Sequence, residues 1–206
     1  MNLQNLNHRV FSALLPLLFL LLLPGSAIAD SRQGNLDFFL LLDRSLSMEQ
    51  EFSSLQNHVE THILDSLLRK GDYIKMVAFY GEIQDVESGI IGRDLEIDRL
   101  KSSLSSLEAD RHYTDIGSAL DYLEQTILDT AREGHTNYVL LLTDGIHEGP
   151  AQSPYPGKTD TLSHPLLKMQ KQTEFEGWKV CLLSITVQEK ASVLAEEVIT
   201  AWQARN

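Results

Sequence analysis

Short runs of apolar residues recur along the chain, and longer segments with helical periodicity separate them. The first run, Phe38 to Leu42 preceded by Leu36, is interrupted only by Asp37 and continues directly into Asp43. A short apolar run of this kind is typical of a strand buried on both faces, as in a parallel sheet covered by helices. The pattern predicts strands over residues 36–43, 73–80, 83–91, 138–143 and 178–186.

Between the strands, apolar residues recur every three or four positions, which predicts amphipathic helices. Helices are expected over residues 48–69, 95–107, 116–132, 162–175 and 191–205. Strands that alternate with helices imply right-handed crossovers and a mainly parallel sheet. We therefore expect an α/β fold, a three-layer Rossmann-like sandwich. Its central sheet would carry one short antiparallel edge strand, residues 83–91, with helices on both faces.

The first 29 residues have the pattern of a secretory signal peptide. Basic Arg9 precedes an apolar run over residues 10–23, and Pro24 and small residues up to Ala29 follow. An uncleaved membrane anchor is the alternative, but a bilayer span needs about 20 apolar residues. We predict cleavage near Ala29, a single folded domain over residues 30–206, and an exported protein that is periplasmic or secreted.

Charge and cysteine content narrow the classes of function. The chain has 17 Lys and Arg residues against 29 Asp and Glu residues, a net charge of −12, and no basic stripe. Nucleic acid and anionic membrane surfaces are therefore poor partners, and membrane contact is expected only through an uncleaved signal. Cys181 is the only cysteine, so an exported form has no disulfide framework and must be stable through its core.

Oxygen-bearing side chains gather where the predicted strands end or a helix begins. They are Asp43, Ser45 and Ser47 after the first strand, Thr114 and Asp115 before a helix, and Asp144 after a later strand. The carboxyl ends of parallel strands share one edge of a sheet, so these corners can meet there. Hydroxyl and carboxylate oxygens are hard donors that suit Mg²⁺, Mn²⁺ or Ca²⁺.

Each of these residues also has a purely structural interpretation. Asp43 could cap the following helix, Thr114 could be an N-cap, and Asp144 with Gly145 could form only a turn. The three corners together favour a metal site.

The combined motifs resemble the von Willebrand factor type A (VWA) domain. Its metal-ion-dependent adhesion site (MIDAS) has D-x-S-x-S after an apolar strand, Thr-Asp before a later helix, and a strand that ends in T-D-G. The resemblance runs from Leu36 to about Ile185. It implies that the hydroxyls of Ser45, Ser47 and Thr114 contact the metal. Asp43 and Asp144 would act directly or through water, and Asp115 would hold the loop.

The resemblance also implies a function. Mg²⁺, or Mn²⁺ or Ca²⁺, would bind an Asp or Glu carboxylate of a protein partner, with no small-molecule substrate and no bond broken. The chain departs from the family pattern at two points. Leu46 stands where many members carry Gly, and the chain ends about one helix after the strand over residues 178–186. The last strand and helix of the family are therefore expected to be abbreviated.

Two other functions compete with the binding module. One is a structural or assembly scaffold whose metal site is vestigial or only stabilising. The other is a phosphotransferase of the haloacid dehalogenase type with Asp43 as nucleophile. That enzyme class needs a second acid two residues later, where this chain has Ser45. No G-x-S-x-G elbow or phosphate-binding Gly-rich loop is present, so we do not expect an enzyme.

The segment over residues 146–163 leaves from the predicted metal edge and carries Tyr155 among prolines. Loops at such an edge often determine specificity, so we expect this one to contact the partner. A solvated connection is the alternative. His112 and His147 flank the predicted site and could tune partner binding, or could be ordinary loop residues.

Overall fold

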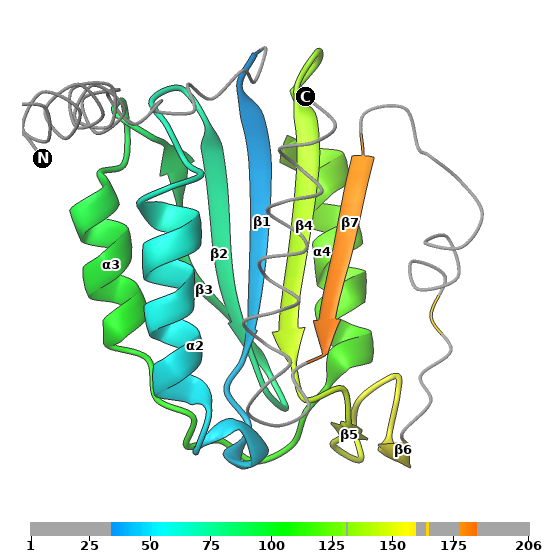
Figure 1. Ribbon diagram of the computed structural model, residues 1–206. Coiled ribbons are helices and arrows are strands. Elements are labelled where there is room, and N and C mark those ends of the chain that lie inside the picture. Colours follow the sequence, from blue (N-terminus) through cyan, green and yellow to red (C-terminus); the bar gives the residue numbers. More distant parts are fainter. Residues whose placement is uncertain (1–33, 131, 160–163, 165–177, 185–206) are drawn as a thin grey trace, which may run out of the picture. The chain divides into compact units, whose positions relative to one another are not determined.

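The computed structural model describes residues 34–130, 132–159, 164 and 178–184, with helices on both faces of a central sheet (Figure 1). The sheet has the strand order β3-β2-β1-β4-β7. Its strands are β1 (Leu36–Asp43), β2 (Tyr73–Phe79), β3 (Ile83–Ile90), β4 (Thr136–Thr143) and β7 (Trp178–Ser184). Neighbouring strands are parallel except for β3, which pairs antiparallel with β2 at the edge. The predicted sheet is confirmed.

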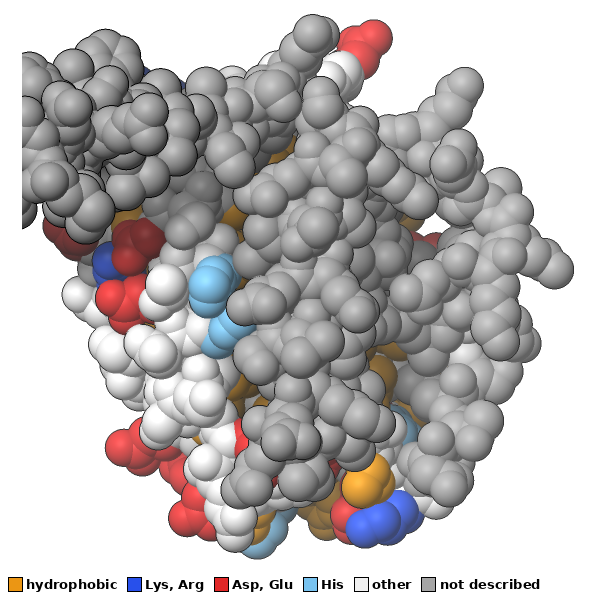
Figure 2. Space-filling view, viewed as in Figure 1, with side chains coloured by type: hydrophobic (Ala, Val, Ile, Leu, Met, Phe, Trp, Pro, Cys, Tyr) orange, Lys and Arg blue, Asp and Glu red, His pale blue; other side chains and the backbone are white. Residues whose placement is uncertain are grey.

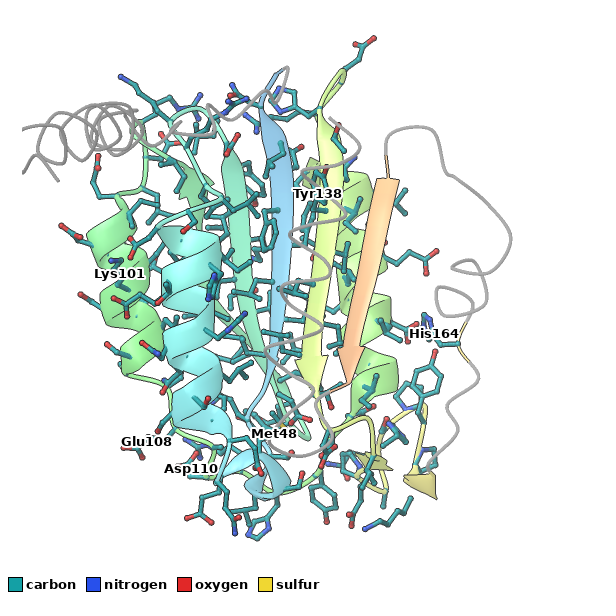
Figure 3. The ribbon with its side chains drawn as sticks, viewed as in Figure 1. Met48, Lys101, Glu108, Asp110, Tyr138 and His164 are labelled. Carbon is teal, nitrogen blue, oxygen red and sulfur yellow. The ribbon has the colours of Figure 1, made fainter. Side chains whose placement is uncertain are left out.

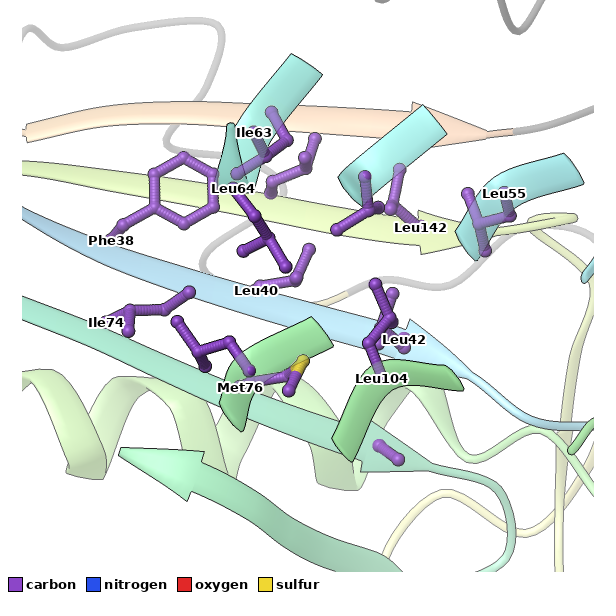
Figure 4. Close-up of a cluster of buried hydrophobic side chains, with 14 of the residues drawn as sticks. Phe38, Leu40, Leu42, Leu55, Ile63, Leu64, Ile74, Met76, Leu104 and Leu142 are labelled. Atoms are coloured by element: carbon purple, nitrogen blue, oxygen red, sulfur yellow. The ribbon is translucent and has the colours of Figure 1, made fainter. Parts of the chain in front are cut away.

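Strand β1 lies at the centre of the sheet, and all of its residues are buried. Successive side chains of a strand point to opposite faces, so the apolar run over residues 38–42 packs on both sides. Phe38, Leu40 and Leu42 belong to one core cluster, part of which Figure 4 shows, and Phe39 and Leu41 belong to the other. Two covered faces explain why the stretch from Phe38 to Leu42 is apolar at every position.

Helices cover both faces of the sheet (Figure 1). They are η1 (Leu46–Met48), α2 (Phe52–His58), η2 (Val59–Leu64), α3 (Ile97–Ser105) and α4 (Ile116–Thr130). Residues of α2, η2 and α3 pack in the cluster with Phe38, and residues of α4 pack in the cluster with Phe39. The three layers are as expected, and the helices predicted over residues 95–107 and 116–132 are confirmed.

The helix predicted over residues 48–69 is not one regular helix. A 3₁₀ turn, η1, comes first, α2 begins only at Phe52, and η2 is a π-helix. In this stretch Leu68 N donates to Ile63 O at 3.0 Å, five residues back. The wider turn lets the adjacent Ile63 and Leu64 both reach the core, together with Leu68. A search for a 3.6-residue period could not predict this arrangement.

The segment expected to be a surface loop after β4 contains a short antiparallel hairpin. Its strands are β5 (His147–Gly149) and β6 (Gly157–Thr159). The predicted signal peptide, the helix over residues 191–205 and, apart from residue 164, the helix over residues 162–175 lie outside the described residues. Among the described helices, none is both long and apolar enough to cross a membrane.

Replacing Leu40 by Ala should destabilise the protein by about 3 to 4 kcal/mol, because it opens a cavity in the fully buried centre of the sheet. Leu128 on α4 is 74% exposed, so Leu128→Ala is a matched control expected to stay within about 0.5 kcal/mol. Urea unfolding followed by circular dichroism measures both. Equal costs for the two variants would contradict the placement of β1 in the core.

Candidate functional site

Two of the predicted corners leave the sheet side by side. Leu42 of β1 pairs with Leu142 of β4, so Asp43 and Thr143 end neighbouring strands. Figure 3 labels Met48 and Asp110 at this lower end of the sheet and Tyr138 toward the other end of β4. Hence the D-x-S-x-S corner and the T-D-G corner share the carboxyl edge.

Backbone hydrogen bonds hold the third corner between these two. On one side, Leu46 N donates to Arg111 O at 2.8 Å and Arg111 N donates to Arg44 O at 3.2 Å. On the other side, Thr114 and Glu148 exchange two backbone hydrogen bonds of 2.9 Å each. The loop that carries Thr114 is thus fixed to the segments that follow β1 and β4. All three predicted corners are brought together.

Three hydroxyl groups lie on these corners. The Oγ atoms of Ser45 and Ser47 are 3.0 Å apart, and Ser45 is buried whereas Ser47 is exposed. Thr114 is 4% exposed, and its hydroxyl makes no hydrogen bond to any described residue. The Thr114 oxygen therefore keeps its lone pairs for another ligand.

Asp43 is a fully buried carboxylate. Its Oδ1 accepts a hydrogen bond from Ser45 N at 2.9 Å, and its Oδ2 accepts one from the Thr143 hydroxyl at 2.6 Å. Burial raises the pKa of Asp43 to about 6, although the hydrogen bonds from Thr143 and Ser45 act in the opposite direction. The nearby charge of Asp144 raises this pKa further. None of the described basic side chains forms an ion pair with Asp43.

Asp144 begins the turn that follows β4. It is only partly buried, and its Oδ1 accepts a hydrogen bond from Ile146 N at 2.9 Å. This bond is of the Asx-turn type, so Asp144 does form a turn. A hydrogen bond to one carboxylate oxygen is compatible with cation binding by the same side chain.

Arg44, inside the D-x-S-x-S motif, holds the surrounding loops and was not predicted. Its buried guanidinium donates to Glu108 O at 2.7 Å, to Gln84 Oε1 at 2.6 Å and to Asp110 Oδ1 at 3.1 Å. The positively charged side chain closest in sequence to Asp43 therefore bonds to the loops and not to Asp43. These partners are 40 to 66 positions away, so no local spacing could have identified them.

The N-cap of α4 is Asp115 rather than Thr114. Asp115 Oδ1 accepts from Ser118 N at 3.0 Å, and its Oδ2 accepts from the Ser118 hydroxyl at 2.8 Å. The alternative that Thr114 caps the helix is therefore wrong. Asp43 does not occupy a capping position either, because Ser45 is the N-cap residue of the next helical turn, η1, and α2 begins only at Phe52. Tyr113 just before has a φ of +70°, a left-handed conformation that costs about 1 kcal/mol or more.

The hairpin of β5 and β6 is fastened to α4 through Tyr155. A Cβ atom at Gly117 would lie 2.3 Å from the Tyr155 ring, so the ring occupies the space that this glycine leaves. The Tyr155 hydroxyl donates to Asp121 Oδ1 at 3.0 Å, and the ring of His164, labelled in Figure 3, lies 2.9 Å from the same oxygen. Tyr155 thus makes internal contacts that hold the loop on α4, and contact of this loop with a partner stays a prediction.

The two flanking histidines have different surroundings. His147 is 2% exposed, and its Nε2 lies 2.7 Å from Tyr155 O, so it belongs to the interior of the hairpin. His112 is exposed, and its carbonyl accepts a hydrogen bond from Gly81 N at 3.3 Å. Of the two, only His112 is available at the surface.

No cluster of three or more His, Cys, Asp or Glu side chains that could hold a metal ion occurs in the part of the chain that the structure describes. A cation at this edge would depend on hydroxyl oxygens together with the carboxylates of Asp43 and Asp144. Such a donor set is hard and oxygen-only, which fits Mg²⁺, Mn²⁺ or Ca²⁺ and excludes a site built on thiolates or imidazoles.

Comparison with known proteins gives a matching family and a relative. A family model described as von Willebrand factor type A domain matches residues 38–147. An uncharacterized protein of Treponema pallidum (strain Nichols) is 30% identical over 189 residues, which is 90% of this chain and 84% of that protein.

Solved structures share the fold at low sequence identity. The pilus adhesin SpaC from Lactobacillus rhamnosus GG has a TM-score of 0.55 at 18% identity over 84% of this chain and 26% of the adhesin. An aerotolerance-related membrane protein from Bacteroides fragilis has a TM-score of 0.53 at 18% identity over 75% of this chain and 70% of its own. A von Willebrand factor type A structure from Catenulispora acidiphila has a TM-score of 0.50 at 19% identity. The match covers 72% of this chain and 33% of that one.

Replacing Asp43 by Asn should stabilise the chelator-treated protein above pH 6. There the folded parent carries an ionised buried carboxylate, which costs about 3 kcal/mol for a pKa of about 6 against the ordinary 3.8. As the pH falls from 6 to 4, the folded parent takes up a proton that the unfolded chain does not yet bind. The advantage of the variant should therefore shrink through this window and vanish below it.

Urea unfolding between pH 4 and 8 measures this difference. Asp129 is exposed on α4, so Asp129→Asn is the control and should stay within about 0.5 kcal/mol of the parent. An Asp43→Asn protein that is less stable than the parent at pH 8 would contradict the prediction.

Proposed function

The chain belongs to the von Willebrand factor type A family, and from this premise we propose that it is a protein-binding module that works through a divalent cation. The cation would be held at the carboxyl edge of the sheet and would bind an Asp or Glu carboxylate of a protein partner. Five residues would hold it, directly or through water: Asp43, Ser45, Ser47, Thr114 and Asp144.

The observation that carries the proposal is the contrast between two aspartates on one strand. Asp37 and Asp43 stand near opposite ends of β1, and both are 0% exposed. Asp37 is neutralised by Arg132, whose Nε donates to Asp37 Oδ1 at 2.8 Å. Asp43 has hydroxyl and amide neighbours and the negative charge of Asp144 nearby. A buried charge needs a partner of opposite sign, and a bound cation would supply one.

The type of donor supports the choice of ion and the choice of ligand. Three of the five groups are neutral hydroxyls, so the cation would keep much of its positive charge. Mg²⁺ prefers six oxygen ligands in octahedral geometry, and five groups leave one position for a further oxygen. A carboxylate is the protein group best suited to that position. The bound cation would supply electrostatic attraction only, and the chain's own residues would bind and orient it.

A scaffold with a purely stabilising ion would share these residues but would not need a partner. A phosphotransferase mechanism has less support, because the residue two positions after Asp43 is Ser45, where that enzyme class needs a second acid. We also propose that the protein is exported by a signal peptide over residues 1–29, on the pattern of Arg9, the apolar run over residues 10–23 and Ala29.

Calorimetric titration of Mg²⁺ and Mn²⁺ into the chelator-treated protein tests the proposal. The parent should bind one ion, and Thr114→Val, which removes one hydroxyl without changing the size of the side chain, should bind it at least about tenfold more weakly. Thr61 is exposed on η2, so Thr61→Val is the matched control and should bind like the parent. Circular dichroism confirms that each variant is folded.

Two results would count against the proposal. A folded parent that binds neither ion at millimolar concentration would contradict a cation site. Equal affinity in the parent, Thr114→Val and Asp43→Ala would show that the ion is held by other residues.

A further inference from the structure

Large exposed hydrophobic side chains are concentrated at the candidate site. In the described part of the chain they are Leu46, Tyr113, Leu128 and Ile146, exposed by 44%, 48%, 74% and 43%. Leu46 lies between Ser45 and Ser47, Tyr113 precedes Thr114, and Ile146 is two residues after Asp144. Each of the three corners therefore presents one large apolar side chain, and Leu128, far along α4, is the exception.

The backbone keeps these three residues on adjoining segments. Leu46 N donates to Arg111 O at 2.8 Å, two residues before Tyr113. Ile146 N donates to Asp144 Oδ1 at 2.9 Å, and two residues later Glu148 pairs with Thr114. At the lower edge of Figure 2, the end of the molecule where β5 lies in Figure 1, exposed hydrophobic surface stands beside acidic and basic side chains. We name Leu46, Tyr113 and Ile146 the apolar rim.

Two residues of the apolar rim adopt arrangements that their side chains do not favour. Tyr113 adopts a φ of +70°, which aromatic residues rarely do, and its ring lies over Gly81, where an added Cβ would be 3.1 Å from the Tyr113 ring. Leu46 begins η1, and its backbone N–H donates to Arg111 O. Its side chain nevertheless remains exposed. Apolar groups gathered on a polar surface mark interaction sites.

The charge around the rim limits what can bind there. Glu49, Glu82 and Glu148 are exposed on the same segments, and the chain as a whole has a net charge of −12. Arg111 and Lys158 are exposed nearby, but Arg111 is paired with Asp110 at 3.1 Å and Lys158 with Glu148 at 3.5 Å, so acidic groups still predominate. A segment with several acidic residues would be repelled by these carboxylates. One carboxylate directed at the cation, with apolar neighbours that cover the rim, would be accommodated.

We propose that the partner segment carries a single Asp or Glu flanked by large apolar side chains, and that the apolar rim recognises those flanking residues. This inference rests on the cation site proposed above. Burying the rim also removes water from around the bound carboxylate, and a lower local dielectric strengthens its attraction to the cation.

Fluorescence anisotropy with labelled peptides tests the proposal on the full protein in Mg²⁺. The probes are Gly-Leu-Asp-Phe-Gly, the same peptide with Ser at both flanking positions, and the same peptide with Asn in place of Asp. The first should bind at least about tenfold more tightly than the Ser-flanked peptide, and the Asn peptide should not bind. Leu46→Ser and Ile146→Ser should each weaken the first peptide at least about fivefold. Tyr113→Asn, which tolerates the left-handed φ, should do the same.

Mg²⁺ calorimetry on the same variants separates the two proposals. The rim variants should keep the parent's Mg²⁺ affinity, and the control Leu128→Ser should match the parent for both Mg²⁺ and peptide. If Mg²⁺ binds and the two acidic peptides bind equally, the rim proposal alone is overturned. If Mg²⁺ binds and neither acidic peptide does, carboxylate capture by the cation fails as well. If Mg²⁺ does not bind to the folded parent, the cation site fails and the rim proposal fails with it.

Discussion

The buried carboxylate at the end of β1 is the constraint to which the surrounding structure responds. Asp43 stands where the central strand of the sheet reaches the carboxyl edge, without exposure to water. At the other end of β1, Asp37 has Arg132 as its ion-pair partner. Around Asp43 the chain supplies the Thr143 hydroxyl and the Ser45 amide, and the adjacent cation, Arg44, bonds to the loop instead. The cation that we propose for this edge would neutralise a buried carboxylate that otherwise lowers the stability of the folded protein.

The same region is rigid because its loops are joined through main-chain hydrogen bonds. The loop that carries Thr114 is bonded to Arg44 and Leu46 on one side and to Glu148 on the other. Arg44 adds side-chain bonds to the residues before that loop. If these residues bind a cation as proposed, groups held in this way would lose little conformational freedom on binding, which favours affinity and selectivity. The left-handed Tyr113 shows that the local arrangement overrides the preference of a single residue.

Much of the fold follows from the sequence, because buried parallel strands must be apolar on both faces. The run before Asp43 is therefore a reliable signal, and the convergence of the three corners follows from the topology. Features that depend on distant partners could not be predicted. Arg44 bonds to Gln84 and Asp110, and Tyr155 fills the space beside Gly117, contacts that no local pattern encodes. The π-helix η2 was not predicted, because a search for helical periodicity assumes a repeat of 3.6 residues throughout.

Anomalous diffraction from a crystal of the protein soaked in Mn²⁺ is the most direct test of the central claim. The claim predicts one strong peak at the carboxyl edge, among the side-chain oxygens of Asp43, Ser45, Ser47, Thr114 and Asp144 and held by them directly or through water. A peak only at other surface carboxylates, or no peak at saturating Mn²⁺, would contradict it.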